Sequence, residues 1–415
     1  MNIWVLVLGE PLETDQNNNR LHRAGMLARK LVDSGHNITL WSSNVDHIKK
    51  ELRSKKTEVL KISENYKLIL LAGRLYKKNI SFARIGHNID VTKEFNKHAD
   101  TQDKPDIVIS NYPIIELTDA ALIYCKNNKI PSIVDIRDFW PDIFYETLPK
   151  SISFIGNILF WSLNRKSKNI VKNATGITGI TSQAIKWARS KNNQDLQETD
   201  KAFPLAYENV KDYKFNKDFL FKNNLDPIRD NIYCFFGNLS NRLELDNVAK
   251  AAKIIHSKNS VNIKLVICGS GEMYKPLMDT AKRCPVLVLP GWIEKDEINT
   301  LLEVSKAGLL PYPSSLDFIR SYPNKVGEYL SKNLPIISSV QGAMDDLISK
   351  FNIGITYQNN SPQSLANTIQ QIEDDENNRK VMSRNAGECF KKMFDADNVY
   401  NDYTSYIEKI SKQNL

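Results

Sequence analysis

The segment Asn231-Ile-Tyr-Cys-Phe-Phe-Gly-Asn-Leu-Ser240 decides the fold of the second half of this chain. Its apolar run ends at Gly237, which is the pattern of a strand buried on both faces and followed by a tight turn. Apolar residues at helical spacing come next, between residues 245 and 255. The order of strand, loop and helix then recurs at residues 263–283, 286–306 and 307–331. Such alternation predicts a parallel sheet with helices on both faces.

The first half of the chain follows the same pattern less clearly. A strand at residues 3–8 ends at Gly9, and the helix after it ends at Gly35, where glycine can adopt a left-handed cap. We expect further strands at residues 38–41, 67–72, 106–110, 133–136 and 176–181. At 415 residues the chain is too long for one ordinary core. We predict domains at residues 1–205 and 206–395, and a final helix at 396–415 that packs back on the first domain.

Composition limits the classes of function. The apolar share of 41% and the charged share of 25% are those of a folded soluble protein. Five scattered cysteines without a CxxC pair predict buried free thiols in a reducing compartment, and argue against disulfides or a zinc site. The net charge of +8 suits anionic substrates or an anionic membrane surface better than nucleic acid, because no repeated basic motif with interleaved aromatic residues is present. We expect neither a signal peptide nor a membrane span, and a cytoplasmic location.

Three glycine-containing segments follow successive strands of the second domain and are expected to share one edge of its sheet. They are Gly237-Asn238, Gly269-Ser270-Gly271 and Gly291-Trp292-Ile293. Glycine lets the backbone approach a ligand closely and exposes amide groups to phosphates. A Walker loop and a GxGxxG run are both absent, which disfavours ATP hydrolysis by that route and dinucleotide-dependent oxidoreduction.

The stretch Ser321-Tyr-Pro-Asn-Lys-Val-Gly-Glu-Tyr-Leu330 predicts one half of a nucleotide-sugar site. Pro323 suits the first turn of a helix, so we expect the amides of Asn324 to Val326 to point out of the helix N-terminus. Lys325 adds a positive charge for a phosphate there. Glu328, one turn deeper, is placed to accept hydrogen bonds from a sugar diol.

Two further segments in the first half allow alternative interpretations. Arg137 and Asp138 follow a buried strand directly, so they either line the ligand-binding edge together with Gly9 or form an ion pair that closes the strand end. Residues 151–172 combine apolar residues with a basic end. That composition fits a helix resting on anionic lipid head groups and equally a core helix with a solvated basic end.

Several of these motifs together resemble a known family of enzymes. A Gly-His turn after the first helix, Asp135-Ile-Arg-Asp-Phe-Trp-Pro141, Gly269-Ser-Gly-Glu272 and Pro323-Asn-Lys-Val-Gly-Glu-Tyr-Leu330 resemble a retaining glycosyltransferase of family 4, over essentially the whole chain. The resemblance is to the branch that builds bacterial O-antigen, capsule and related glycans. It implies an α/β chain of GT-B fold, in which two Rossmann-like domains have parallel sheets facing across a cleft.

The resemblance also implies roles for individual residues. Glu328 matches the glutamate that binds the ribose hydroxyls, and Lys325 matches a cation facing the diphosphate. The segment from Gly291 to Ile293 would receive the base through its backbone. Arg320 stands where many members carry a second glutamate, so Arg320 itself, Ser321 or backbone amides would serve the donor there instead. Arg242 is a further candidate for the phosphates.

The implied reaction moves a sugar from a nucleotide donor, UDP- or GDP-linked, to a glycan or an undecaprenyl-diphosphate-linked acceptor on the inner face of the cell membrane. Lys325 would stabilise the leaving diphosphate and Asp138 would line the reaction centre, without a metal or a further cofactor. The loop from Gly9 to Arg20 would face the acceptor or close over the diphosphate, and Arg137 would lie on the acceptor side. The alternatives are a nucleotide-sugar epimerase of the same fold, or a non-catalytic homologue that binds a nucleotide or glycan, which the arginine at position 320 favours.

Overall fold

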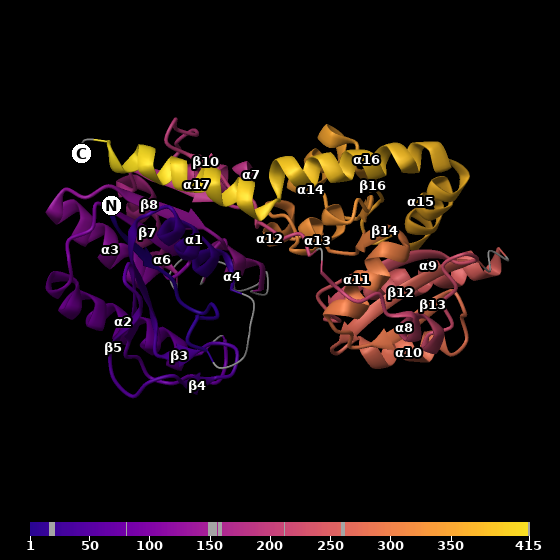
Figure 1. Cartoon of the computed structure of the whole chain (residues 1–415), viewed down its shortest axis with the longest axis horizontal. Helices are drawn as coiled ribbons and strands as arrows, with labels where there is room; N and C mark the ends of the chain where they lie inside the picture. Colours follow the sequence, from indigo (N-terminus) through magenta and orange to yellow (C-terminus); the bar gives the residue numbers. More distant parts are fainter. Residues whose placement is uncertain are drawn as a thin grey trace. The chain divides into compact units, whose positions relative to one another are not determined.

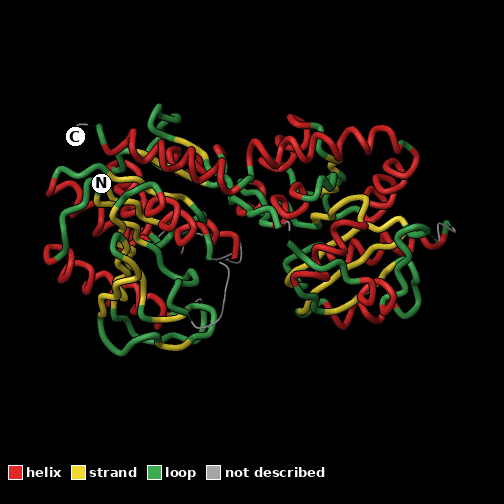
Figure 2. Tube along the Cα trace, in the orientation of Figure 1, coloured by secondary structure: helices red, strands yellow, loops and turns green. Residues whose placement is uncertain are grey.

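The structure is a computed structural model that describes residues 1–15, 21–79, 81–147, 156, 160–210, 212–258 and 262–413. The chain forms two compact units. Unit 1 comprises Met1–Pro204 and Val399–Leu415, and unit 2 comprises Leu205–Asn398. In each unit the strands form a central layer flanked by helices (Figure 2).

Unit 1 is built on an eight-stranded sheet with the order β10-β9-β8-β7-β1-β2-β6-β5. The strands are β1 (Asn2–Leu6), β2 (Asn37–Ser43), β5 (Glu58–Ser63), β6 (Tyr66–Leu71), β7 (Ile107–Tyr112), β8 (Ser132–Ile136), β9 (Gly176–Gly179) and β10 (Lys201–Ala202). All neighbours are parallel except β5, which pairs antiparallel with β6. A separate hairpin joins β3 (Val45–Asp46) to β4 (Glu51–Leu52).

The helices of unit 1 pack on this sheet (Figure 1). They are α1 (Arg23–Asp33), α2 (Phe82–His98), the 3-10 turn η1 (Ala99–Thr101), α3 (Ile115–Asn128), α4 (Asp142–Thr147), α6 (Trp161–Asn173) and α7 (Ser182–Ser190). Trp4 and Trp41 on neighbouring strands meet edge to face with ring centroids 4.9 Å apart, and Phe95 of α2 lies 5.1 Å from Trp41. These fully buried rings join the sheet to α2.

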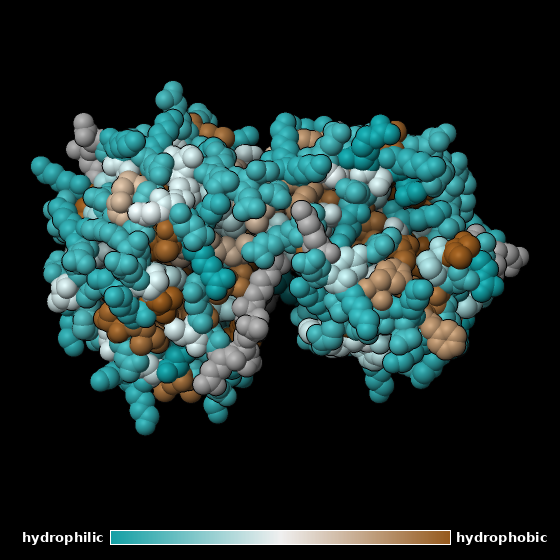
Figure 3. Space-filling model, viewed as in Figure 1, coloured by the Kyte–Doolittle hydropathy of each residue, from teal (hydrophilic) through white to brown (hydrophobic). Residues whose placement is uncertain are grey.

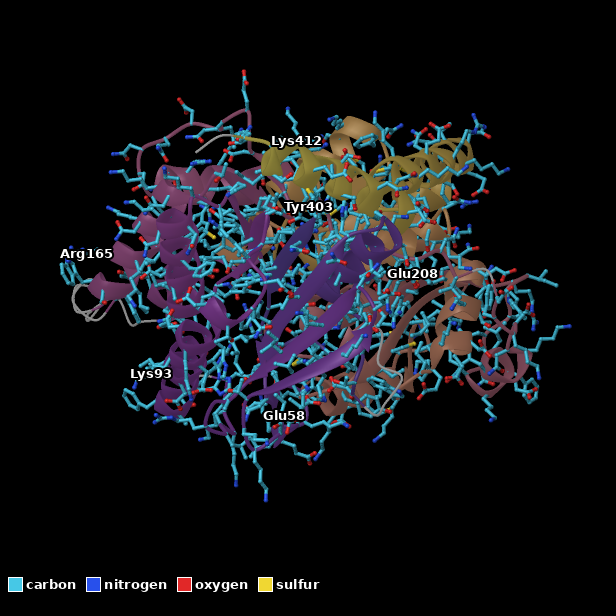
Figure 4. The ribbon with its side chains drawn as sticks, turned by 60° about the vertical axis from the view of Figure 1, so that its left-hand side comes forward. Glu58, Lys93, Arg165, Glu208, Tyr403 and Lys412 are labelled. Carbon is cyan, nitrogen blue, oxygen red and sulfur yellow. The ribbon has the colours of Figure 1, made fainter. Side chains whose placement is uncertain are left out.

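The last helix, α17 (Ala396–Ser411), packs on unit 1 from Val399 onward. Tyr403 projects from α17 (Figure 4). Its ring stacks on Phe203 with ring centroids 4.1 Å apart, and its hydroxyl lies 2.8 Å from that of Thr178 on β9. Tyr406 donates a hydrogen bond to the carbonyl oxygen of Thr199 at 2.6 Å. These contacts place the end of the chain against the β9–β10 side of the first sheet.

Unit 2 contains a parallel six-stranded sheet with the order β13-β12-β11-β14-β15-β16. The strands are β11 (Asn231–Asn238), β12 (Ile263–Ser270), β13 (Leu287–Gly291), β14 (Ser305–Leu310), β15 (Ile336–Ser338) and β16 (Gly354–Thr356). The helices are α8 (Lys217–Lys222), α9 (Leu245–Ser257), α10 (Tyr274–Ala281), α11 (Lys295–Val304), α12 (Leu316–Ile319), α13 (Lys325–Ser331), α14 (Ala343–Phe351), α15 (Pro362–Asp374) and α16 (Glu376–Met393).

The predicted strands of both domains are present, but parts of unit 1 differ from the sequence-based prediction. The long helix α2 was not predicted, because two of its four buried positions are the polar residues His87 and Asn88 and its apolar periodicity is therefore weak. The edge strand β5 was also missed. Its residues alternate between exposed and half-buried, and Val59 is half exposed.

The five cysteines are free and buried, as the sequence predicted. Within the described ranges, no helix combines the length and the hydropathy needed to cross a bilayer. Much of the segment 151–172 lies outside the described residues. Its described end, α6, buries Ser167, Ile170 and Val171 and leaves Trp161 exposed, with the guanidinium of Arg165 over the Trp161 ring at 5.6 Å. Contact of this segment with a membrane stays a prediction.

Candidate active site

The carboxyl ends of β11 and β14 mark the point in unit 2 at which the strand order reverses. β11 pairs with β12 on one side and with β14 on the other. In open parallel sheets, ligands bind in the crevice outside the strand ends at such a point. The predicted loop segments Gly237-Asn238 and Gly269-Ser270 are the last residues of β11 and β12, so the backbone of both reaches this edge in a fixed register.

Glycine is required at this edge by close approach of the two strand ends. A Cβ atom on Gly269 would lie 1.8 Å from the carbonyl oxygen of Gly237, and Gly269 has a φ of +133°. A Cβ atom on Gly237 would lie 2.6 Å from Nζ of Lys325. The missing side chain at Gly237 therefore makes room for the Lys325 ammonium group against the end of β11.

Lys325, the first residue of α13, holds its ammonium group in a half-buried position. Nζ lies 5.3 Å from the ring centroid of Phe235 and 5.7 Å from that of Phe236, which is cation–π range. Burial lowers the pKa of Lys325, and the nearby Glu328 carboxylate acts in the opposite direction. A partly desolvated cation beside open backbone is suited to bind an anion.

Tyr329 fixes α13 onto the sheet. Its side chain is fully buried, and its hydroxyl lies 3.3 Å from the carbonyl oxygen of Cys234 on β11 and 3.1 Å from that of Leu309 on β14. The ring lies over Gly308, where a Cβ atom would be 2.3 Å from it. Tyr329 thereby sets the height of Lys325 and Glu328 above the strand ends. The sequence analysis did not identify this anchoring role.

Glu328 lies one turn along α13 from Lys325 and is half-buried. Burial raises the pKa of the Tyr312 hydroxyl, and the Glu328 carboxylate acts in the same direction. Tyr312 follows β14 and is buried. The site thus presents a cation and a carboxylate from the same short helix, and their roles toward a phosphate group and a diol stay predictions.

The N-terminus of α13 differs from the sequence-based expectation. The amide of Val326 donates to the carbonyl oxygen of Pro323 at 2.9 Å, which closes a turn in place of an outward-facing donor. Asn324 is exposed, has helical backbone angles and makes no capping hydrogen bond with its side chain. The expectation of three ligand-facing amides is therefore wrong at Val326, and the side chains of α13 carry more of the site than its backbone.

The two arginines proposed for the phosphates are engaged within unit 2. Arg242 forms an ion pair with Asp317 at 2.8 Å, although its side chain is 62% exposed. Arg320 ends α12, and its guanidinium reaches back toward the Leu316 carbonyl oxygen at 3.4 Å. Ser321 continues the turn by donating its amide to Phe318 at 3.2 Å. Donor contacts by Arg242, Arg320 and Ser321 stay predictions.

The segment proposed for the base leaves β13 at Gly291. Trp292 is 68% exposed, and its indole nitrogen donates to Glu294 at 3.0 Å. The side chain of Ile293 is buried, so only its backbone is placed to contact a ligand. Asn238, Ser270 and Gly271 are exposed at the ends of β11 and β12. They lie at the same edge as Lys325.

In unit 1 the Arg137 side chain forms ion pairs at the end of β8, with Asp135 and Glu10 as partners. It pairs with Asp135 at 2.9 Å and with Glu10, and the same Asp135 carboxylate accepts two hydrogen bonds from Arg23 at 2.9 and 3.0 Å. Asp135 and Arg23 are almost completely buried. Arg137 therefore belongs to a buried network of two carboxylates and two guanidinium groups, and its contact with an acceptor stays a prediction.

Asp138 accepts hydrogen bonds from the Phe139 amide at 2.8 Å and from the Trp140 indole at 3.1 Å. These bonds fix the loop after β8, and a catalytic role for Asp138 stays a prediction. Gly9, with a φ of +83°, follows β1, and a Cβ atom there would lie 3.5 Å from the His47 ring. Arg20 lies outside the described residues.

The described parts of the chain hold no group of three His, Cys, Asp or Glu side chains arranged to bind a metal ion. The expected metal-independent reaction stays a prediction.

Residues 216–388 match the family model described as "Glycosyl transferases group 1", and this range contains the whole site of unit 2. No curated protein matches the chain. Sucrose-phosphate synthase from Thermosynechococcus elongatus is 13% identical with a TM-score of 0.70, and the match covers 99% of this chain and 98% of that one. HepE from Anabaena, solved in complex with UDP, is 12% identical with a TM-score of 0.65, covering 98% and 99%.

WaaG, a glycosyltransferase involved in lipopolysaccharide biosynthesis, is 14% identical with a TM-score of 0.60, covering 98% of this chain and 99% of that one. At such identities these likenesses establish the fold alone. The chain has the α/β fold of GT-B glycosyltransferases, with two Rossmann-like units.

Proposed function

We propose that this protein is a retaining glycosyltransferase of family 4 that takes its sugar from a nucleoside-diphosphate donor bound by unit 2. The placement of Lys325 and Glu328 carries the proposal. Both side chains stand on α13 beside the strand ends at the switch point, inside the range that matches the glycosyltransferase model. HepE, which shares the fold, binds UDP, and this supports a nucleotide donor here.

In the proposed complex the donor diphosphate lies against Lys325 and the glycine-lined ends of β11 and β12. Glu328 accepts hydrogen bonds from the ribose hydroxyls, and the backbone around Ile293 receives the base. Breaking the sugar–phosphate bond leaves negative charge on the diphosphate, which the Lys325 ammonium stabilises more strongly in the transition state than in the ground state. This positive charge takes the place of a divalent metal. With retention, the acceptor hydroxyl attacks from the face that the diphosphate leaves, and the departing phosphate accepts its proton.

We assign the acceptor to unit 1 and propose a lipid-linked glycan, with a surface polysaccharide such as O-antigen or capsule as the product. The resemblance of the motifs to that branch of the family supports this assignment, and so does the fold shared with WaaG. The exposed Trp161 and the basic end of α6 support peripheral contact with the inner face of the membrane.

A thermal-shift panel of UDP, GDP, dTDP and ADP on the full chain tests the donor assignment. One nucleotide is expected to raise the melting temperature most, and its sugars are then offered with acceptor. Lys253 of α9, an exposed lysine remote in sequence from the site, supplies the matched control Lys253→Ala for Lys325→Ala.

The proposal predicts that Lys325→Ala loses the nucleotide-induced shift and that Lys253→Ala retains it. If none of the four nucleotides stabilises the wild-type chain, or if both variants respond alike, the donor site is wrongly placed. Conversion of the nucleotide sugar alone into an isomer would instead support an epimerase.

A further inference from the structure

Unit 1 contains a pocket of about 430 Å³ beyond the carboxyl ends of its strands. Its walls come from the start of α2, which follows β6, from the start of α3, which follows β7, and from the segments after β8. Open parallel sheets bind ligands outside the carboxyl ends of their strands, and a pocket of this volume has the size of a ligand site. The apolar part of the wall is formed by Ile85, Ile115, Trp140, Phe144, Phe160 and Leu163.

Asn88 of α2 is a buried polar residue in the lining of this pocket. It is only 6% exposed. The Thr92 hydroxyl donates to its backbone carbonyl oxygen at 2.7 Å, but within the described ranges its side-chain amide makes no hydrogen bond to the protein. Burial of an amide without a partner costs folding free energy. The Asn88 amide therefore has both a donor and an acceptor available for a molecule in the pocket.

Glu116 offers a second polar group to the same space. It stands in the first turn of α3, is half-buried and lines the pocket. Among the residues that the structure describes, no cationic side chain forms an ion pair with it. An ionised carboxylate only accepts hydrogen bonds, so Glu116 is suited to an N–H or O–H group of a ligand.

Arg84 adds one positive charge to the lining. Its guanidinium donates to the Asn79 carbonyl oxygen at 2.7 Å and lies over the Trp140 ring at 5.1 Å. The nearby Ser81 hydroxyl already accepts a hydrogen bond from the Arg84 amide at 3.2 Å. One guanidinium and one carboxylate thus line the pocket, so an anionic ligand would be repelled by Glu116 and a cationic one by Arg84. This balance of charge favours a neutral ligand.

We infer that this pocket binds the acetamido group of an N-acetylated sugar in the acceptor. An acetamido group combines an N–H donor for Glu116, a carbonyl acceptor for the Asn88 amide and a methyl group for the apolar wall. The apolar face of the sugar ring packs against an aromatic ring such as that of Trp140. The inference rests on the proposed function, because it names a sugar of the acceptor that unit 1 is proposed to hold.

The pocket is open to solvent beside α2. Ile85 lines it and is 52% exposed, and Phe82 and Ile89 of the same helix are also exposed. Figure 3 shows hydrophobic surface over this helix. The opening lets one sugar of a longer glycan enter the pocket while the neighbouring sugars stay outside.

The probes are the methyl glycosides of N-acetylglucosamine, N-acetylgalactosamine and N-acetylfucosamine, titrated into the full chain by saturation-transfer difference NMR. Each is compared with the methyl glycosides of its parent sugar and of the free amino sugar, which carries a cation. At least one acetamido sugar is expected to bind at least about tenfold more tightly than both of its comparison sugars, because these lack the amide carbonyl and the methyl group. Its acetyl methyl group is expected to receive the largest saturation.

Three results would overturn the inference. They are equal binding of an acetamido sugar and its parent, tighter binding of the free amino sugar, and no binding of any acetamido sugar. The second of these would mean a site for a cation.

Variants test the two polar groups separately. Asn88→Leu is expected to weaken binding of the preferred acetamido sugar at least about tenfold, and Glu116→Gln at least about fivefold, because an amide oxygen is a weaker acceptor than a carboxylate. The controls are Asn96→Leu, at an exposed position of α2, and Glu64→Gln, an exposed residue between β5 and β6, and both lie outside the pocket lining. Equal losses of affinity in the control variants would refute the assignment.

Stability separates a ligand-binding role of Asn88 from a structural one. Since its amide has no hydrogen bond to lose within the described structure, Asn88→Leu is expected to leave the urea midpoint unchanged or to raise it. A clear fall of the midpoint would assign the amide to the fold and overturn the inference.

UDP binding is measured on every variant, because it reports on unit 2. A chain that binds UDP but shows no preference for an acetamido sugar would refute this inference and leave the proposed function standing. A chain that prefers the acetamido sugar but binds none of the nucleotides would support the pocket assignment and overturn the donor site.

Discussion

Replacement of Lys325 by methionine tests the donor site most directly, because binding and stability are expected to respond in opposite ways. Lys325 is half-buried between Gly237 and the rings of Phe235 and Phe236. If its ammonium binds the donor diphosphate, Lys325→Met removes a charge-assisted hydrogen bond worth about 1.5–3 kcal/mol. The expected loss of affinity for the nucleoside diphosphate is roughly 10- to 150-fold.

The stability of the unliganded chain follows from the pKa of the same group. In the folded state the Lys325 pKa is lowered below its ordinary value of 10.5, so the unfolded chain binds this proton more tightly. The charged ammonium therefore costs folding free energy at neutral pH, and the cost falls as the pH rises through the folded pKa toward the unfolded one. Lys325→Met should leave the stability of unit 2 at pH 7 unchanged or raise it, and the variant should lose the part of the pH dependence that this group contributes.

Isothermal calorimetry with the preferred nucleotide and urea denaturation at pH 7 and pH 9.5 measure both effects, with Lys253→Met as the control. A variant that binds the nucleotide as tightly as the wild type would refute the assignment. So would a variant that is clearly less stable at pH 7, since the lysine would then be acting through its contacts with the aromatic rings.

The other predictions concern the donor site of unit 2 and the buried ion-pair network of unit 1. Glu328→Gln should weaken binding of the nucleotide and of its sugar conjugate but leave binding of inorganic pyrophosphate nearly intact, as measured by calorimetry. Equal losses of affinity for the nucleotide and for pyrophosphate would contradict a role of Glu328 in diol binding. Gly269→Ala should abolish the nucleotide-induced thermal shift, because the new methyl group would collide with the Gly237 carbonyl oxygen. An undiminished shift would show that the ends of β11 and β12 separate freely. Arg23→Met leaves the Asp135 carboxylate buried beside a single guanidinium and should cost about 3–5 kcal/mol in the denaturation of unit 1, whereas a loss below about 1 kcal/mol would contradict the buried network.

The fold of unit 2 was predictable from sequence because each strand is a short apolar run that ends at a loop, and the central strands β11, β12 and β14 are mostly buried. The strand from Ile232 and its successors all lie where the pattern placed them. In unit 1, α2 escaped prediction because His87 and Asn88 occupy buried positions on it. Helix propensity and hydrophobic periodicity do not indicate a buried helix face when its polar side chains are satisfied by tertiary hydrogen bonds in the interior, as His87 is, or line a pocket, as Asn88 does.

The candidate site was predictable only where its residues are neighbours in sequence. Lys325 and Glu328 stand one turn apart on one helix, so spacing was enough to find them. Arg137 pairs with Asp135 two positions away, but it also pairs with Glu10 across 127 positions, and local spacing does not indicate that second partner. The hydrogen bonds from Lys50 and Arg84 to Asn79 were not predicted for the same reason, because they join two loops to a helix that was not predicted.

The position of α17 has a consequence for the order of events during synthesis. Unit 1 is encoded in two pieces, with the whole of unit 2 between them. When the ribosome has made residues 1–204, the surface that carries Phe203 and Thr178 still lacks its covering tyrosines. Unit 2, although encoded second, is the first to emerge with all of its strands and helices, so the nascent chain should complete its second fold before its first. An expressed fragment of residues 1–204 would lack that cover, and fusing residues 399–415 to its end is the way to supply it.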